Sequence, residues 1–517
     1  MTRIRSIRPR TLSRALPAAL TATALLSLTA CGGGGSEGAS SSSATALSLA
    51  VQAAPASFDP AQLNEGQATY IWSALYDTLL NTDNNGELKP NAAESWKYSD
   101  DGLALTLKLR KGMTFSSGAP VNAAAVKATL ERTMSTPGPQ QVPLASVKSV
   151  EAPDTNTVVI HLRQPDGALL TNLSMAAGVI ADPATMAKKS SQLNPVGSGP
   201  YTLDKATVNG SSYVLKRRDD YWNAKAYPFK TLKFKVIVDP TAAYNALQAG
   251  QIDAGPAAPQ YTAKLKSAGF SMTLVKATAV ANLILADRTG SVLKPLGDAR
   301  VRQAINMAFD RTKIVKQLLM GVGQPTVQIV NPKSAAYDSA LEQTYPDDPA
   351  AAKKLLAEAG YPNGFSVTVP SFVFTKQLEP TVGQQLGDIG IKVKWTPVPP
   401  QNNLGAIASK KYPMFLFFDG LNTPARQMAN NFGPTAVLNP FKTTDPQLTK
   451  LMTQAASQLD PASADAAYKP VNELLVKNAW DAPIAYLGNN WAVKKGIKYL
   501  GDGSNTNSTI RAFDVVG

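Results

Sequence analysis

Two kinds of hydrophobic spacing alternate along the chain. Leucines at every second position from Leu103 to Leu109 predict a strand with one buried face. Phe234, Val236 and Val238 repeat the period of two among lysines and predict another strand. Elsewhere hydrophobic residues recur every three or four positions, which is typical of helices; these segments are 68–80, 123–133, 299–309 and 448–459.

The stretch from Asn194 to Asp253 combines these signals most closely. It opens with a Gly/Pro turn, in which Gly197 and Gly199 can take positive φ and Pro200 fixes the exit. Two strands and a short helix that ends at Gly250 are expected to follow. The stretch contains no nucleophile, metal cluster or phosphate-binding loop, so its residues predict a structural role.

Capping residues divide the second half of the chain into helices and strands. Asp298 and Asp310 precede helical patterns, and a third helix is expected between Asp348 and Gly360. A strand at 366–369, a helix at 377–388 and a strand at 391–398 follow, which predicts a βαβ unit with a parallel pair. Other expected segments are helices at 261–268 and 464–477, a strand at 271–274, an extended apolar segment at 279–286 and a returning strand at 480–487.

Length and charge narrow the class of protein. A chain of 517 residues, 44% hydrophobic and 17% charged, predicts a globular protein of two or three domains. Five basic residues and no acid lie in residues 1–30, which leaves 46 basic and 37 acidic residues beyond them, a net charge of +9. Because no run of lysine or arginine concentrates this charge, nucleic-acid binding is not expected.

The N-terminus predicts an export signal. Arginines precede a short apolar stretch from Leu16 to Leu28, followed by Ala30 and Cys31, the only cysteine. This end resembles the lipobox of bacterial lipoproteins, which implies cleavage before Cys31 and lipidation of that residue. A signal peptide at 1–30 and a flexible Gly/Ser-rich tether at 31–45 are therefore expected, with a structural cysteine or an ordinary signal peptide as the alternatives.

The sequence lacks the residues that several classes of enzyme need for catalysis. His161 is the only histidine, which argues against a histidine-based triad or metal site. There is no Gly-x-Ser-x-Gly sequence, and the acid pairs at 219–220 and 347–348 are adjacent, as in turns and helix caps. A hydrolase is therefore disfavoured; no catalytic residue, resident metal or cofactor is expected.

Five strings in the chain resemble a known family. They are VGSGPY at 196–201, RDDYW at 218–222, DARVRQAINMAFDR at 298–311, AKKLLAEAGYPNGF at 352–365 and GIKV at 390–393. Together they are similar to the extracytoplasmic solute-binding proteins of family 5, the oligopeptide, dipeptide and nickel-binding group of ABC importers. The resemblance extends over residues 46 to about 500.

The resemblance implies a bilobed α/β fold of the periplasmic-binding-protein type with a small inserted domain. Lobe I would comprise 46–84, 192–285 and 486–517, the inserted domain 85–191, and lobe II 286–485. The two lobes would close on a peptide-like solute, and the closed form would dock on a membrane permease. ATP would be hydrolysed by partner subunits, because this chain has no Walker motif. The expected protein is a monomer held outside the cytoplasm by a lipid anchor.

The same resemblance implies two sets of ligand-binding residues. In the first lobe, Asn64, Glu65 and Gly66 match positions where the backbone of a peptide pairs with the protein, although an ordinary surface loop would look the same. Buried ammonium groups need a carboxylate partner, and Asp419 is the candidate to bind the amino terminus of a peptide. Thr423 stands where a second acid is expected, which departs from the family pattern.

Residues around Asp419 complete the expected site. Phe417 and Phe418 are candidates to line an apolar pocket, with one of them alternatively filling the core beneath a strand. Asn422 belongs to the same loop, and Arg426 is suited to a carboxylate or a phosphate. The departure at 423 leaves non-peptide solutes open, among them amine-blocked compounds, sugar derivatives and chelated metals. A receptor or adhesin lipoprotein of the same fold is a further alternative.

Overall fold

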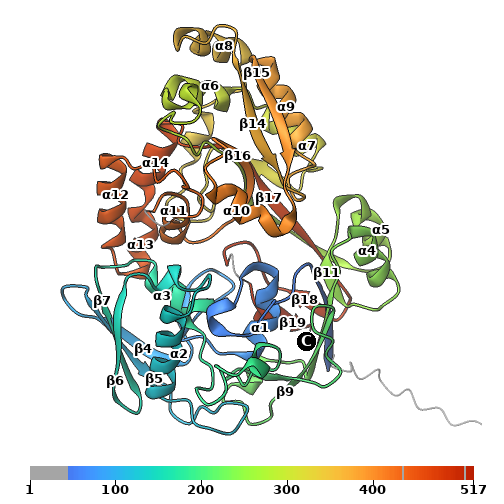
Figure 1. The fold of residues 1–517 in the computed structure, drawn as a ribbon. Coiled ribbons are helices and arrows are strands. Elements are labelled where there is room, and N and C mark those ends of the chain that lie inside the picture. Colours follow the sequence, from blue (N-terminus) through green and yellow to red (C-terminus); the bar gives the residue numbers. More distant parts are fainter. Residues whose placement is uncertain (1–44, 434–435, 506–507, 517) are drawn as a thin grey trace, which may run out of the picture. The chain divides into compact units, whose positions relative to one another are not determined.

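The computed structural model describes residues 45–433, 436–505 and 508–516 (Figure 1). The expected signal peptide, Cys31 and nearly all of the expected tether lie outside the described residues. In the described part of the chain, no helix has both the length and the apolar character needed to cross a bilayer.

A nine-stranded sheet forms the largest structural unit. Its order is β16-β12-β17-β11-β1-β10-β9-β8, and β13 also pairs with β17. β1 is parallel to β10 and β11, and the other neighbours are antiparallel. The strands are β1 (Ala46–Val51), β8 (Tyr201–Leu203), β9 (Ser212–Arg217), β10 (Thr231–Val236), β11 (Ala254–Pro256), β12 (Ser271–Ile284), β13 (Gly323–Pro325), β16 (Phe415–Gly420) and β17 (Ala482–Val493).

Two long strands, β12 and β17, connect the two lobes. The strand expected at 271–274 and the apolar segment expected at 279–286 form one strand, β12. Its pairing with β17 is interrupted, because Val275 pairs with Asn489 and Ala279 with Leu487. Three residues of β12 therefore face one residue of β17, a local irregularity of the β-bulge kind.

The first lobe is the body around β1, β8–β11 and helix α1 (Thr69–Leu75). Its core is a cluster rich in aromatic residues. Helix α1 is shorter than the expected 68–80 because the Leu75 carbonyl accepts a hydrogen bond from Gly199 N at 2.9 Å. Gly199 and Gly197 do not have positive φ; a Cβ on Gly197 would lie 1.9 Å from the Leu75 oxygen. Close approach, not backbone freedom, therefore requires glycine here.

The rest of the 194–253 stretch confirms the expected elements. Strands β9 and β10 pair with each other, and helix α4 (Pro240–Gln248) follows. Gly250 has φ +66 after the helix, a left-handed conformation that glycine adopts readily. The stretch thus builds one edge of the large sheet.

A small domain carries a separate four-stranded antiparallel sheet. Its order is β4-β5-β7-β6, and helix α2 (Ala123–Ser135) contributes to its core. His161 lies on β7 and contacts Glu151 on the neighbouring β6 at 3.3 Å. The strands are β4 (Ala93–Tyr98), β5 (Ala104–Leu109), β6 (Val147–Asp154) and β7 (Thr157–Leu162). Helix α3 (Leu169–Leu173) packs in the same core, and the hairpin of β2 (Leu80–Thr82) and β3 (Leu88–Pro90) borders it. Helix α5 (Thr262–Ser267) and the pair β18 (Ile497–Tyr499) with β19 (Phe513–Val515) lie outside this domain.

The second lobe is the body around β14 (Phe365–Ser371), β15 (Ile391–Pro397) and β16. β14 and β15 are parallel, which confirms the predicted βαβ unit around α9 (Glu379–Asp388). Asp298 and Asp310 accept hydrogen bonds from Arg300 N and Lys313 N, as expected of capping residues. The helices next to them are α6 (Ala299–Met307), α7 (Arg311–Gln317) and α8 (Pro349–Glu358).

Helices α10–α14 complete the second lobe. The helix expected at 464–477 is divided into two at Tyr468. Pro470 lies in the first turn of the second helix, where its missing N–H costs nothing, whereas a continuous helix would place it in the interior. The elements are α10 (Asn403–Ala408), α11 (Pro424–Phe432), α12 (Pro446–Ala456), α13 (Pro461–Ala467) and α14 (Lys469–Lys477).

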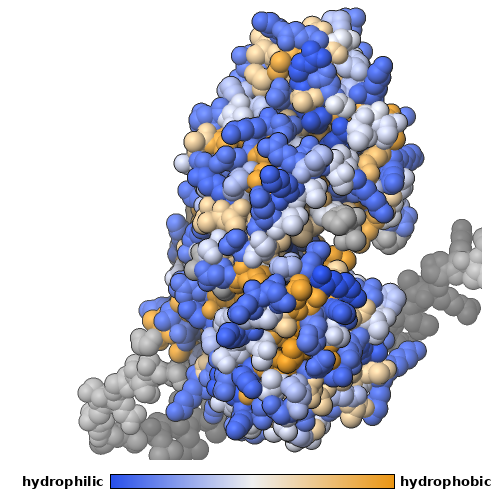
Figure 2. Space-filling model, turned by 90° about the vertical axis from the view of Figure 1, so that its left-hand side faces the viewer, coloured by the Kyte–Doolittle hydropathy of each residue, from blue (hydrophilic) through white to orange (hydrophobic). Residues whose placement is uncertain are grey.

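The small domain also contacts the second lobe. Ala168 packs in a hydrophobic cluster with Leu421, Ala425 and Met428. In the space-filling view, hydrophobic side chains gather around the middle of the molecule rather than at its upper end (Figure 2). Cavities lined by residues of both lobes and of the small domain lie in this region.

Candidate ligand-binding site

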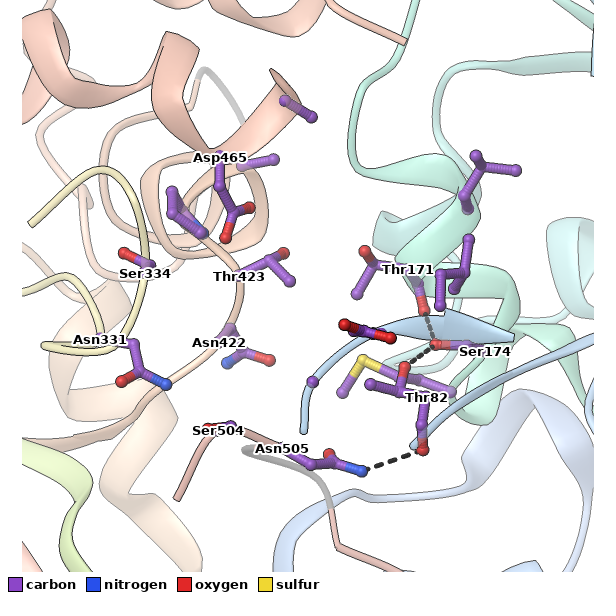
Figure 3. Close-up of a pocket in the computed structure, with 18 of the residues that line it drawn as sticks. Thr82, Thr171, Ser174, Asn331, Ser334, Asn422, Thr423, Asp465, Ser504 and Asn505 are labelled. Atoms are coloured by element: carbon purple, nitrogen blue, oxygen red, sulfur yellow. Dashed lines mark hydrogen bonds between the residues drawn. The ribbon is translucent and has the colours of Figure 1, made fainter. Parts of the chain in front are cut away.

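Two adjoining cavities lie between the lobes. The larger, about 670 Å³, is called the Asp419 cavity here. The smaller, about 450 Å³, is called the Asp465 cavity (Figure 3). Met175, Asn422 and Asn505 line both, so one solute can extend from one into the other. Volumes of this size suit small organic ligands.

The Asp419 cavity brings together candidate residues from distant parts of the sequence. Six of the eight predicted ligand-binding residues line it: Asn64, Glu65, Gly66, Phe417, Asp419 and Asn422. Arg426 is not among the lining residues but forms an ion pair with Glu65, and Phe418 packs against the core of the second lobe. Tyr70 and Trp491, which the sequence analysis did not single out, also line the cavity.

The Asn64–Gly66 loop is held in place by helix α1. The Asn64 carbonyl accepts a hydrogen bond from Trp72 Nε1 at 2.8 Å, and Trp72 is buried in the core. Gly66 has φ +73, which lets the chain turn from the loop into α1. This places the side chain of Glu65 at the cavity.

Asp419 occupies the end of β16 with one carboxylate oxygen unpaired. Asn431 Nδ2 donates to Oδ2 at 2.8 Å, and Gln427 Nε2 donates to the same oxygen. No described residue donates to Oδ1. Burial raises the pKa of Asp419 to about 6, and the nearby Asp481 carboxylate also raises it, whereas the two amide donors oppose these effects. A cationic group at Oδ1 would offset the cost of burying the charge.

Gln427 and Asn431 are candidate site residues that the sequence analysis did not identify. They lie one turn apart on α11, so both amides face the same carboxylate. Their spacing of four in the segment after Pro424 is the only sequence signal, and it becomes useful only once that segment is predicted as a helix. The pairing with Asp419 depends on how α11 packs against β16.

Glu65 and Arg426 form an ion pair between the two lobes. Arg426 Nη2 lies 2.7 Å from Glu65 Oε2, and the side chains are only 11% and 18% exposed, respectively. Arg426 also contacts the sulfur of Met175. Glu65 Oε1 has no hydrogen-bond partner among the described residues. Arg426 is therefore paired with a carboxylate of the protein itself and not left for a carboxylate or phosphate of a ligand.

The two phenylalanines lie on opposite faces of β16. Phe417 lines the Asp419 cavity and makes edge contacts with Phe372, Phe374 and Phe415. Phe418 packs against the hydrophobic core of the second lobe. This follows from the alternation of a strand, in which neighbouring side chains point to opposite faces.

The described part of the chain offers no cluster of side chains suited to hold a metal ion. In the ranges that the structure describes, no group of three or more His, Cys, Asp or Glu side chains is placed to hold a metal ion. Arg302 and Arg311 of the 298–311 string are buried and donate to backbone carbonyls, among them Ala479 and Pro483. These two arginines join α6 and α7 to the start of β17.

Comparison with known proteins identifies the family. Residues 87–445 match the model of the bacterial extracellular solute-binding proteins, family 5. The chain belongs to this family. The glutathione-binding protein GsiB of Escherichia coli O1:K1 is 30% identical over 448 residues, which cover 83% of this chain and 86% of GsiB. This relative and the family description concern binding proteins.

Solved structures agree with this assignment. The PBP AgaA from A. tumefaciens R10, in complex with agropinic acid, is 25% identical with a TM-score of 0.77, covering 91% of this chain and 99% of AgaA. The ABC transporter-associated periplasmic binding protein DppA from Helicobacter pylori, in complex with the peptide STSA, is 24% identical with a TM-score of 0.77, covering 91% and 98%. The bilobed periplasmic-binding-protein fold expected from the sequence is therefore confirmed.

Proposed function

We propose that this protein is the solute-binding component of an ABC importer and that it captures a peptide-like solute with a free amino terminus. The observation that carries the proposal is Asp419, whose Oδ1 is unpaired at the wall of a cavity of about 670 Å³. An α-ammonium group is a suitable partner, because buried carboxylates are stabilised by a charged donor. The similarity to GsiB and DppA supports the choice of peptides.

The solute would be bound and released without chemical change. The protein would close its lobes on the solute and deliver it to a membrane permease, with ATP hydrolysed by other subunits. The membership in a family of solute-binding proteins and the similarity to GsiB support this. Small-angle scattering should show a smaller radius of gyration with saturating solute; an unchanged radius would contradict closure.

The domain boundaries are proposed as the sequence analysis has them. Lobe I comprises 46–84, 192–285 and 486–517, the inserted domain 85–191, and lobe II 286–485. Separate hydrophobic clusters around β1, around the four-stranded sheet and around β14 support the division.

We also propose that Cys31 is lipidated. The Cys31→Ala variant should accumulate as precursor or be released from the membrane, and normal acylation of that variant would contradict the anchor.

A non-peptide solute is the second candidate. AgaA holds agropinic acid, and the Asp465 cavity is lined largely by amides and hydroxyls, which suit polyhydroxylated compounds as well as peptides. In that case the amide- and hydroxyl-bearing residues, and not Asp419, would dominate the affinity.

Titration calorimetry separates the two candidates. Asp419→Asn should weaken binding of a free peptide about a hundredfold or more, because removing one side of a buried charge pair costs about 3–5 kcal/mol. The N-acetylated form of the same peptide should be far less sensitive. Native mass spectrometry of the purified protein would first show which solute co-purifies. If no peptide of any length binds the wild type, the peptide assignment is wrong.

A further inference from the structure

The Asp465 cavity has two walls with different origins. Asn331, Ser334, Asn422, Thr423 and Asp465 lie on the side of the second lobe (Figure 3). Thr82, Thr171 and Ser174 lie across from them, and Ser504 and Asn505 lie below. A solute held at Asp419 can reach this space past Asn422 and Met175, which line both cavities.

Most polar groups of these walls are already engaged within the protein. Thr82 Oγ1 and Ser174 Oγ lie 2.9 Å apart, and Ser174 Oγ also donates to the Thr171 carbonyl at 2.8 Å. Asn505 Nδ2 donates to the Thr82 carbonyl at 3.1 Å. These bonds fix the wall opposite Asp465 (Figure 3).

Asp465 is the one charged residue lining the Asp465 cavity that forms no ion pair with a described residue. Four charged residues line the cavity, and three are in ion pairs: Glu87 with Lys89 at 2.5 Å, and Lys333 with Asp502. Among the described residues, no donor hydrogen-bonds to the Asp465 carboxylate and no cation pairs with it. Burial alone raises its pKa to about 6. Asp465 is thus a desolvated carboxylate whose charge the described chain does not balance.

The position of Asp465 in its helix gives it no structural role that would offset the free-energy cost of burying an unpaired charge. It lies in the second turn of α13, past the positions at which a carboxylate caps a helix or interacts with the positive end of the helix. Figure 3 shows its carboxylate on the second-lobe wall of the cavity, pointing toward Thr423. An isolated carboxylate in such a site favours a cationic partner and repels an anionic one.

We propose that the Asp465 cavity receives a cationic side chain of the solute, an ammonium or a guanidinium, so that the solute is a peptide with a basic residue beyond its amino-terminal group. The inference rests on the proposed peptide-binding function. Asp419 would bind the α-ammonium and Asp465 the side chain, each giving a charge-assisted hydrogen bond to a different end of one ligand. Peptides with acidic side chains at the same position would be rejected.

Matched peptides test the inference by calorimetry. The probes are the tripeptides Ala-Lys-Ala and Ala-Ala-Lys and their norleucine counterparts, which keep the side-chain length and lose the charge. The wild type should bind at least one lysine peptide about tenfold to a hundredfold more tightly than its norleucine partner, the range expected of a charged hydrogen bond. Asp465→Asn should abolish this preference while binding the norleucine peptide within about threefold of the wild type.

Two variants serve as controls. Asp465→Glu keeps the charge and should keep part of the lysine preference, which a variant that merely disturbed α13 would not. Glu87→Gln removes a carboxylate of the same cavity that is already paired with Lys89, and it should leave the preference unchanged.

The outcomes separate this inference from the function on which it rests. Equal binding of lysine and norleucine peptides by the wild type, or an undiminished preference in Asp465→Asn, overturns the role of Asp465 and leaves peptide binding intact. Failure of all four peptides to bind the wild type overturns the role of Asp465, and it overturns peptide binding as well if peptides of other lengths also fail to bind.

Discussion

The guanidinium of Arg426 on α11 lies 2.7 Å from the carboxylate of Glu65 in the loop before α1. One residue belongs to the second lobe and the other to the first, and both side chains are largely buried. The pair therefore contributes to the contact between the two lobes, and Asp419 is the acid in the same cavity for which no described residue provides a cationic partner.

Breaking the Glu65–Arg426 pair should lower stability and loosen the contact between lobes. Glu65→Gln and Arg426→Gln are each expected to lower the free energy of unfolding by about 1–3 kcal/mol, because the remaining charge stays largely buried. The double variant should lose less than the sum, as expected of residues in contact. Denaturant unfolding measures the cycle; strictly additive losses would show that the pair is not coupled. Scattering from unliganded Arg426→Gln should give a larger radius of gyration.

Affinity for a peptide with a free amino terminus should decrease with acidification. Unliganded Asp419 has a pKa of about 6, and a bound ammonium would lower it. Between pH 7 and pH 5 the free protein must therefore give up a proton to bind, and the affinity should fall about tenfold. Titrations of wild type and Asp419→Asn at both pH values provide the measurement. The variant should lose this dependence; an equal dependence in both proteins would assign the proton elsewhere.

The same carboxyl group should influence the stability of the unliganded protein. Its pKa is raised in the folded state, so its stabilising contribution is present below about pH 4 and is lost as the pH rises through about 6. Asp419→Asn removes this loss, and at pH 7–8 the variant should be more stable than the wild type by about 1–3 kcal/mol. Thermal unfolding at pH 4 and pH 8 measures the difference, which should be small at the lower pH. A variant that is less stable at pH 8 would contradict this.

The adjacent phenylalanines of β16 offer a matched pair of substitutions. Phe417→Ala removes part of the cavity wall and should weaken solute binding, whereas Phe418→Ala should mainly lower stability, by about 2–4 kcal/mol, because it leaves a void against the second lobe's core. Calorimetry and denaturant unfolding on both variants separate the two effects. A stronger loss of affinity in Phe418→Ala than in Phe417→Ala would mean that the cavity is not where the solute binds.

Replacing either of two glycines by alanine should change the stability of the protein, in opposite directions. A Cβ on Gly199 would lie 2.5 Å from the Leu75 backbone carbon, so Gly199→Ala should lower stability by about 1–3 kcal/mol or more. Gly387 lies inside α9 with open space around its Cα, so Gly387→Ala should raise stability by about 0.5–1 kcal/mol. The melting temperatures of both variants test the assignment. Tolerance of alanine at 199 would mean that the turn relaxes away from α1.

Local chemistry made much of the fold predictable. The caps at Asp298 and Asp348, the helix end before Gly250 and the parallel pair of β14 and β15 depend on residues close together in sequence. The prediction of one helix at 464–477 was wrong, although Pro470 carried the signal for a division, because proline fits the first turn of a helix and not its interior. The full length of β12 could not be predicted from the sequence, since its continuity past residue 275 depends on pairing with β17.

The candidate site was only partly predictable for a physical reason. Resemblance to the family pointed to the Asn64–Gly66 loop and to Asp419, and these line one cavity. It did not give the partner of Glu65, the face of β16 that carries Phe417, or the unpaired state of Asp465. Each of these depends on packing between elements that are far apart in the chain.

The position of β1 in the large sheet constrains the order in which the chain can fold. β1 lies between β10 and β11, and β11 pairs with β17. Trp491 on β17 and Phe513 on β19 pack in the same core as Leu47 and Leu49 of β1. A polypeptide that emerges amino end first, from a ribosome or a translocation channel, cannot complete the surroundings of its earliest strand until its last segment has appeared. Elongation and native assembly are therefore separated in time, and truncation before Trp491 should prevent the first lobe from forming at all.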